Sequence, residues 1–165
     1  MISQPMLTML AKNQDHFLIP AEKVANVQVD NKLNHAFLVL TKVRYSKIPV
    51  LDADSKFIGL LSMPMITDTM LGLDDIDVSQ LSQHYVGEVC ERDVATVENP
   101  YDIELILHLL VDDPFLPVVS REGDFTGIVT RREMMKSFNY VVHNFEREPQ
   151  LIKQGEVNEN LTLKK

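Results

Sequence analysis

The apolar and polar positions of this chain follow the same order twice. When residues 18–70 are shifted by 68 positions, they align without a gap on residues 86–138, and Pro49 then coincides with Pro117. A constant offset predicts one structural unit built twice, because self-similarity at a fixed period marks a repeated supersecondary unit.

Each copy is expected to begin with a strand and a helix. Apolar residues alternate in 25–29 and in 94–97, which is the period of a β-strand. In the first copy, apolar residues from Leu33 to Val43 recur every three or four positions, as on one face of a helix. At the same offset, the face of the second helix is predicted to consist of Tyr101, Leu105, His108 and Val111, widened by Ile103, Ile106, Leu107 and Leu110.

A hairpin and a second helix complete each copy. Two apolar runs separated by a polar turn predict the hairpin. The runs are 48–51 and 57–61 in the first copy, and 116–119 and 125–129 in the second. Ser62 and Thr130 are predicted to open the helices that follow.

The predicted fold is therefore α+β, with two β-α-β-β-α repeats packed as a pseudo-two-fold pair and a short helix near the N-terminus. The predicted domain organisation is an N-terminal segment (1–16), repeat 1 (17–70), a linker (71–85), repeat 2 (86–140) and a partly mobile C-terminal tail (141–165).

Composition narrows the class of function. A net charge of −8 argues against a non-specific nucleic-acid binder, so an anionic ligand needs a local basic group. Cys90 is the single cysteine, which fits a reducing compartment. No apolar run reaches the roughly 18 residues of a membrane span. We expect a cytoplasmic protein without a membrane or nucleic-acid partner.

Catalytic and metal-binding patterns are missing from the sequence. The five histidines show no metal-ligand spacing, and no glycine-rich phosphate loop or nucleophile elbow occurs. The acidic run 74–77 resembles the start of a calcium loop, but Ser79 and Tyr85 occupy the positions of the required Gly and Glu. We expect a protein that is not an enzyme and needs no cofactor or metal.

Two motifs carry a resemblance to a known family. They are Ile48-Pro49-Val50 followed by Phe57-Ile58-Gly59-Leu60-Leu61-Ser62, and Leu116-Pro117-Val118 followed by Phe125-Thr126-Gly127-Ile128-Val129-Thr130. This pattern resembles the tandem CBS domain pair, or Bateman module, over about residues 17–140. The resemblance implies a sensor that binds adenine nucleotides in clefts between its copies and forms homodimers.

The resemblance also implies which residues would bind the nucleotide. The first site would use Lys23, Val24, Ala25, Tyr45, Ser46, Ile48, Pro49, Ile128, Thr130, Arg131, Arg132 and Glu133. The second would use Arg92, Asp93, Val94, Asp113, Phe115, Leu116, Pro117, Ser62 and Met65.

Charge separates these two candidate sites. The first gathers Lys23, Arg131 and Arg132, and the two arginines open a helix whose N-terminus attracts phosphate. The second has Asp113, and Met65 where the family places an acid for the ribose. A carboxylate near phosphate weakens binding, so we expect the second site to be empty or weak.

The first site departs from the common family pattern because Glu133 replaces the usual Asp. With its paired arginines it resembles the stand-alone bacterial CBS proteins that bind cyclic di-AMP. That subfamily implies a protein effector bound in trans, for instance a (p)ppGpp synthetase/hydrolase.

Other interpretations stay open at this stage. An energy sensor for AMP, ADP or ATP, or a structural dimerisation module without a ligand, fits the same repeats. Thr130 and Glu133 also form the sequence of a capping box, which needs no ligand. The alternative interpretation of Arg131 and Arg132 is a solvated pair at the start of a helix, although cations at a helix N-terminus oppose its dipole.

Overall fold

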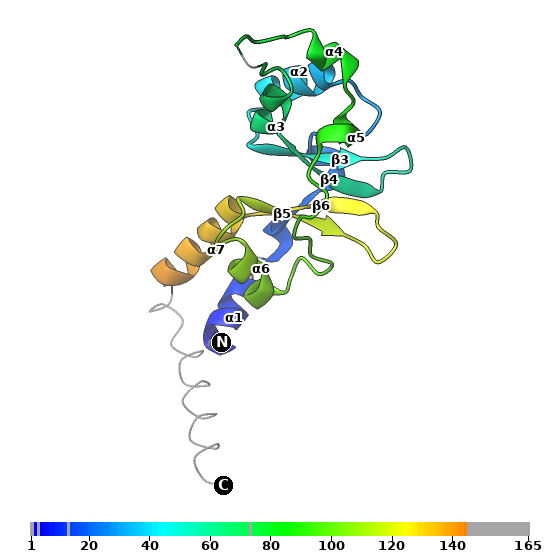
Figure 1. The fold of residues 1–165 in the computed structure, drawn as a ribbon. Helices are drawn as coiled ribbons and strands as arrows, with labels where there is room; N and C mark the ends of the chain where they lie inside the picture. The colour runs from blue at the N-terminus through cyan, green and yellow to red at the C-terminus, as the bar shows by residue number, and fades with distance from the viewer. Residues whose placement is uncertain (1, 3, 13, 73, 145–165) are drawn as a thin grey trace, which may run out of the picture. The chain divides into compact units, whose positions relative to one another are not determined.

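The computed structural model describes residues 2, 4–12, 14–72 and 74–144, and the described residues fall in two compact units (Figure 1). Unit 1 comprises the described residues within Met1–Ile19, Asn99–Leu116 and Ile128–Lys165, and unit 2 comprises those within Pro20–Glu98 and Pro117–Gly127. The mixture of helices and two three-stranded sheets confirms the α+β prediction.

Unit 2 is built on the first predicted hairpin. Its sheet has the order β2-β3-β4, from Val27–Gln28, Lys47–Leu51 and Phe57–Ser62. β2 runs parallel to β3, with Val27 opposite Val50, and β3 runs antiparallel to β4, with Pro49 opposite Leu60. The hairpin prediction is confirmed for this copy.

Helices cover the sheet of unit 2 because their apolar residues share one face. α2 (Leu33–Val43) buries Leu33, Ala36 and Leu40 in a cluster with Ile48 and Leu61. Ser62 caps α3 (Met63–Asp68) by accepting a hydrogen bond from the Met65 amide at 3.4 Å, as predicted. The remaining short helices of this unit are η2 (Ala21–Lys23), α4 (Gln80–Gln83) and α5 (Val86–Val89).

Gly59 explains one position of the repeated motif. The Leu60 amide donates to the Glu91 carbonyl, and the Glu91 amide donates to the Leu60 carbonyl, both at 2.9 Å. A Cβ on Gly59 would overlap the Glu91 carbonyl oxygen. The close approach of these two backbone segments therefore requires glycine.

The turns of the two hairpins meet inside unit 2 in a locally symmetric way. Phe57 donates its amide to the Gly123 carbonyl at 2.9 Å, and Phe125 donates to the Ser55 carbonyl at 3.2 Å. Each residue of one bond lies 68 positions from its counterpart in the other. Equivalent residues thus exchange hydrogen bonds across a local two-fold axis, as a pseudo-two-fold pair of repeats requires.

Unit 1 contains α1 (Gln4–Ala11), η1 (Gln14–His16), α6 (Ile103–Leu109) and α7 (Arg131–Asn144). α1 confirms the predicted N-terminal helix, and it packs against α7. The second sheet has the order β1-β6-β5, from Leu18–Pro20, Phe125–Thr130 and Phe115–Val119, and the boundary between the units falls inside these strands. α7 continues to Asn144, and the rest of the predicted C-terminal tail lies outside the described residues.

The predicted face of the second-copy helix is partly wrong. Three of the residues predicted to widen it, Ile103 and Ile106 in α6 and Leu110 at its end, are buried. The residues predicted as its centre, Tyr101, Leu105, His108 and Val111, are exposed. The buried residues match Leu33, Ala36 and Leu40 at an offset of 70 rather than 68. A gapless alignment gave the helix the wrong register because both faces of this segment carry apolar residues.

The first strand of the second copy also differs from the prediction. Residues 94–97 form no strand, and Val97 alone makes a parallel bridge to Val118. In the first copy Val27 lies opposite Val50, so the offset at this strand is again 70. The hairpins keep the offset of 68, and the connection from helix to hairpin is therefore two residues shorter in the second copy.

Candidate functional site

The twelve residues predicted for the first site divide between the two units. Seven lie in unit 2, namely Lys23, Val24, Ala25, Tyr45, Ser46, Ile48 and Pro49. Five lie in unit 1, namely Ile128, Thr130, Arg131, Arg132 and Glu133.

In unit 2 the predicted residues have two kinds of role. Val24, Ile48 and Pro49 are buried, so they shape the backbone rather than present side chains to a ligand. Lys23, at the end of η2, and Tyr45 are exposed, and Tyr45 retains 39% of its accessible surface. Together with the exposed Ser46, they are the predicted residues of this unit whose side chains face solvent.

The end of α2 places Tyr45 and Ser46. Arg44 follows the helix in the left-handed conformation, with φ 58° and ψ 33°. Its amide donates to the Leu40 carbonyl at 2.9 Å, which closes the helix with a backbone cap. The chain then passes through the exposed pair Tyr45 and Ser46 into β3.

In unit 1 the predicted residues surround the start of α7. The Thr130 hydroxyl accepts from the Glu133 amide at 3.2 Å, so it satisfies one of the unpaired amides of the first turn. The Glu133 carboxylate pairs with Lys136 Nζ at 2.6 Å. Thr130 thus has the structural role of a helix cap, and the carboxylate of Glu133 has an ion-pair partner.

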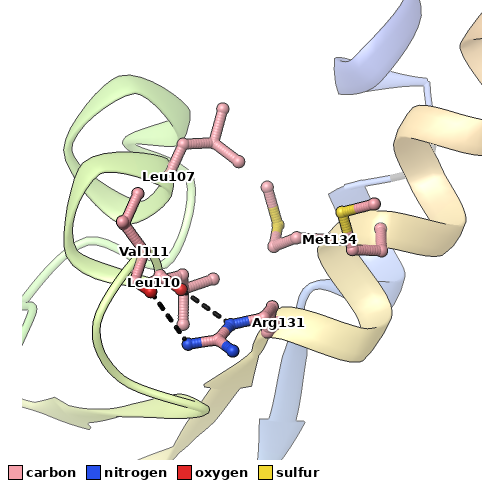
Figure 2. Close-up of a pocket in the computed structure, with 6 residues that line it drawn as sticks. Leu107, Leu110, Val111, Arg131 and Met134 are labelled. Atoms are coloured by element: carbon pink, nitrogen blue, oxygen red, sulfur yellow. Dashed lines mark hydrogen bonds between the residues drawn. The ribbon is translucent and has the colours of Figure 1, made fainter.

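Arg131 and Arg132 have different surroundings. Arg131 Nε donates to the Leu110 carbonyl at 2.7 Å, and its Nη2 donates to the Val111 carbonyl at 3.1 Å (Figure 2). The same Nη2 also donates to the Asp113 carbonyl at 2.9 Å. Arg132 is exposed and makes no side-chain hydrogen bond or ion pair with another described residue. Of the two, Arg132 is the cation whose donors are open to a phosphate.

A cavity of about 290 Å³ lies in unit 1 between α6 and α7. Figure 2 shows side chains of α6 facing Met134 of α7, with Arg131 reaching from the start of α7 to the end of α6. The lining residues are Leu107, Leu110, Val111, Arg131, Met134 and Met135. The walls are apolar, and three donor contacts of the one cation are already taken by carbonyls.

The residues predicted for the second, weaker site are also divided. Asp113, Phe115 and Leu116 belong to unit 1, and the other six belong to unit 2. Arg92, the one cation of this set, donates to the Gly87 carbonyl at 3.0 Å. Met65 lies half-buried against the core of unit 2.

Other reactive groups have structural partners. The Asp77 carboxylate in the linker accepts from Ser79 and Gln80, and these bonds lower the pKa of Asp77. Burial raises the pKa of the Cys90 thiol. Among the described residues there is no group of three or more His, Cys, Asp or Glu side chains suited to a metal ion.

In the part of the chain that the structure describes, no helix has the length and apolar character needed to span a bilayer.

The sequence did not lead us to predict the hydrogen bonds between Arg131 and the carbonyls at the end of α6. The signal that would have found them is the shortened connection after the second-copy helix, 111–115 compared with 41–47 in the first copy. That shortening appears only when the buried faces of the two helices are aligned. The gapless alignment concealed it.

Comparisons with known proteins place this fold. A CBS domain family model matches residues 86–140. Cyclic di-AMP receptor B of Bacillus subtilis (strain 168) is 36% identical over 147 residues, which cover 89% of this chain and 100% of that protein.

Two solved structures extend the comparison. CbpB of Listeria monocytogenes, in complex with c-di-AMP, is 46% identical, with a TM-score of 0.74, over 79% of this chain and 98% of that one. CbpB from Streptococcus agalactiae is 31% identical, with a TM-score of 0.79, over 89% of this chain and 92% of that one.

Proposed function

This chain belongs to the CBS domain family, and we propose that it is a nucleotide-sensing regulatory protein that binds cyclic di-AMP and signals through contact with a second protein. The observation that carries the proposal is the relative named as a cyclic di-AMP receptor, which aligns over its whole length with 36% identity. The proposed protein is not an enzyme and acts in the cytoplasm, where a single unpaired cysteine is kept reduced.

The proposed binding surface consists of the twelve residues predicted for the first site. Its charge supports this choice, because the chain carries a net charge of −8 and a dinucleotide with two phosphates needs local cations. Lys23 and Arg132 are exposed cations, and neither has a side-chain partner among the described residues. Tyr45 supplies an exposed ring on which an adenine base stacks.

A thermal-shift panel with AMP, ATP, cyclic di-AMP and cyclic di-GMP tests the ligand. A ligand at a hundred times its dissociation constant stabilises a protein by about 2.7 kcal/mol. We expect the largest shift with cyclic di-AMP. A larger shift with AMP or ATP identifies an energy sensor, and no shift with any nucleotide identifies a structural module.

Arg132→Met tests the site. We expect the variant to lose most of the cyclic di-AMP shift while its unfolding temperature without ligand stays near that of the wild type. Arg121→Met is the matched control, since Arg121 is 81% exposed, pairs with Glu98 and lies outside the proposed surface. Equal shifts in the two variants contradict the site assignment.

We propose that the protein is a homodimer and that exposed apolar side chains of unit 1 contribute to the contact. Met135 and Val142 are 61% and 65% exposed and lie seven positions apart on α7, which places them on the same face. Light scattering after size exclusion should give the mass of a dimer for the wild type and a smaller mass for Val142→Glu. Tyr140→Glu, at an exposed position about 140° around α7 from Met135, is the control and should remain dimeric.

The effector is proposed to be a protein bound in trans, for which the resemblance suggests a (p)ppGpp synthetase/hydrolase. A nucleotide changes this contact only if it binds the free and the complexed protein with different affinity. Binding measured with and without cyclic di-AMP therefore tests the proposal. We expect a difference for the wild type that Arg132→Met abolishes.

A further inference from the structure

The two copies close the end of their first helix in different ways. In unit 2 the Leu40 carbonyl accepts from the backbone amide of Arg44 at 2.9 Å. In unit 1 the equivalent carbonyl is that of Leu110, and it accepts from Arg131 Nε at 2.7 Å. A side chain from α7 thus does for α6 what a backbone amide does for α2.

The length of the segment that follows each helix explains why a side chain replaces a backbone amide in the second copy. Residues 41–47 separate Leu40 from Ile48 and include the left-handed Arg44, whereas only 111–115 separate the equivalent residues Leu110 and Leu116. Leu110 itself stays right-handed, with φ −70° and ψ −4°. Carbonyls at the end of a helix need donors, and the shorter connection supplies too few from its own backbone.

We infer that Arg131 is a positioning residue, which holds the end of α6 to the start of α7 and leaves Arg132 to contact the nucleotide phosphates. The inference rests on the proposed binding of cyclic di-AMP. Arg131 is fixed from both sides, because its backbone amide also donates to the Pro114 carbonyl at 2.9 Å. The residue at the equivalent position of the first copy is Met63, where the backbone cap of α2 makes an arginine unnecessary.

Geometry supports the division of labour between the two arginines. Successive residues on an α-helix point about 100° apart, so Arg131 and Arg132 cannot both lie along α6. A planar guanidinium that serves three carbonyls must leave them unpaired in order to turn toward a phosphate. Arg132 has no such bonds to break with any residue that the structure describes.

Paired substitutions distinguish positioning from charge. Lysine keeps the charge of arginine but not its planar fork of donors, whereas glutamine keeps planar N–H donors and loses the charge. Titration calorimetry with cyclic di-AMP compares Arg131→Lys, Arg131→Gln, Arg132→Lys and Arg132→Gln at low and high salt. We expect both variants at 131 to weaken binding by a similar factor, about tenfold, with the salt dependence of the wild type.

At position 132 we expect Lys to retain most of the affinity and Gln to lose about tenfold or more, with a weaker salt dependence. Arg131→Lys binding like the wild type while Arg131→Gln binds weakly overturns the inference, because charge alone would then explain the role of Arg131. Wild-type affinity in both variants at 131 overturns it as well.

Hydrogen exchange of the ligand-free proteins separates this inference from the proposed function. Arg131→Lys should speed exchange of the backbone amides of Val111, Asp113 and residue 131 relative to Arg132→Lys. The reason is that the end of α6 and the start of α7 would separate more often. If the wild type fails to bind cyclic di-AMP, the proposed function is wrong, and exchange still reports whether residue 131 joins the helices. If the wild type binds and exchange at these amides is unchanged in Arg131→Lys, the positioning role is wrong.

Discussion

The connection from α2 to β3 and the connection from α6 to β5 perform the same task with different parts. In the first copy residues 41–47 separate Leu40 from Ile48, and the backbone amide of the left-handed Arg44 closes the helix. In the second copy residues 111–115 separate Leu110 from Leu116, and the closing donor is the guanidinium of Arg131, which follows the next hairpin in the chain. One closure is local in sequence, and the other requires a tertiary contact.

This difference shows where duplicated units diverge. Buried positions keep their spacing because both copies must cover a sheet, as the pairs Leu33 with Ile103 and Leu40 with Leu110 show. The exposed helix end is under no such constraint, so it lost two residues in one copy relative to the other. The consequence is that hydrogen bonds of Arg131 join the start of α7, where the proposed phosphate contact lies, to the end of α6. Among the described residues, no side chain makes the equivalent bond in the first copy.

The largest expected effect tests the corrected register. Leu110→Ala should lower the free energy of unfolding by about 2–5 kcal/mol, as should Leu40→Ala in the first copy, because each removes a buried side chain. His108→Ala, which changes the residue aligned with Leu40 by the gapless offset, should stay within about 0.5 kcal/mol. Urea denaturation measures all three. A large cost for His108→Ala would restore the gapless register.

A second prediction concerns the closure made by Arg131. Arg131→Met should lower the free energy of unfolding by about 1–3 kcal/mol, because three carbonyls at the end of α6 lose a charged donor. Arg132→Met should change it by less than about 0.5 kcal/mol, since that side chain has no described partner. The comparison is made in urea without ligand. Equal costs for the two variants would mean that the bonds of Arg131 add nothing to stability.

A third prediction concerns the closure made by the backbone. Arg44→Gly should raise the free energy of unfolding by about 0.5–1 kcal/mol, because glycine adopts positive φ without the steric cost that a Cβ imposes. Lys42→Gly, within the last turn of the same helix, should lower it by about 1 kcal/mol. Thermal unfolding gives both values, and a destabilised Arg44→Gly would show that the arginine side chain matters at this position.

The smallest expected effect lies at the local two-fold axis, where the equivalent residues Lys56 and Asp124 carry opposite charges. Their 2.7 Å hydrogen bond holds the pKa of Asp124 below its ordinary value and raises the pKa of Lys56. The stabilisation is therefore present at neutral pH and is lost as pH falls through the lowered pKa of Asp124. It is also lost as pH rises through the raised pKa of Lys56.

Lys56→Met supplies the measurement for this pair. The difference in unfolding free energy between wild type and variant should be largest near neutral pH and should narrow on both sides. A difference that stays constant from neutral pH to about pH 3 would mean that Asp124 does not titrate against Lys56.

Much of the fold could be predicted from the sequence, for physical reasons that are local. The runs around Pro49 and Pro117 alternate with polar turns, so the hairpins form where the pattern changes. Ser62 and Thr130 have hydroxyls at the point where an apolar strand ends, and both cap the helices that follow. The stripe from Leu33 to Val43 matched α2 because only one of its faces is continuously apolar.

The candidate site was predictable as a set of residue types and less so as a set of roles. Family resemblance and charge selected Lys23, Arg131 and Arg132 together, since a sequence shows that cations are present and not what they bind. The second-copy helix was misread because apolar residues such as Leu105 and Val111 occupy its exposed face. Burial is a property of the packed molecule, and it alone selects between two apolar faces.

By itself the sequence determined the duplication, the alternation that makes the hairpins, the capping hydroxyls and the surplus of negative charge that confines an anion site to a few cations. Each of these depends on residues close together in the chain or on composition. The tertiary structure decided which face of α6 is buried. It also decided that Arg131, rather than Arg132, donates hydrogen bonds to the carbonyls at the end of α6. These outcomes depend on two segments about twenty residues apart being brought within hydrogen-bonding distance, and only packing fixes that distance.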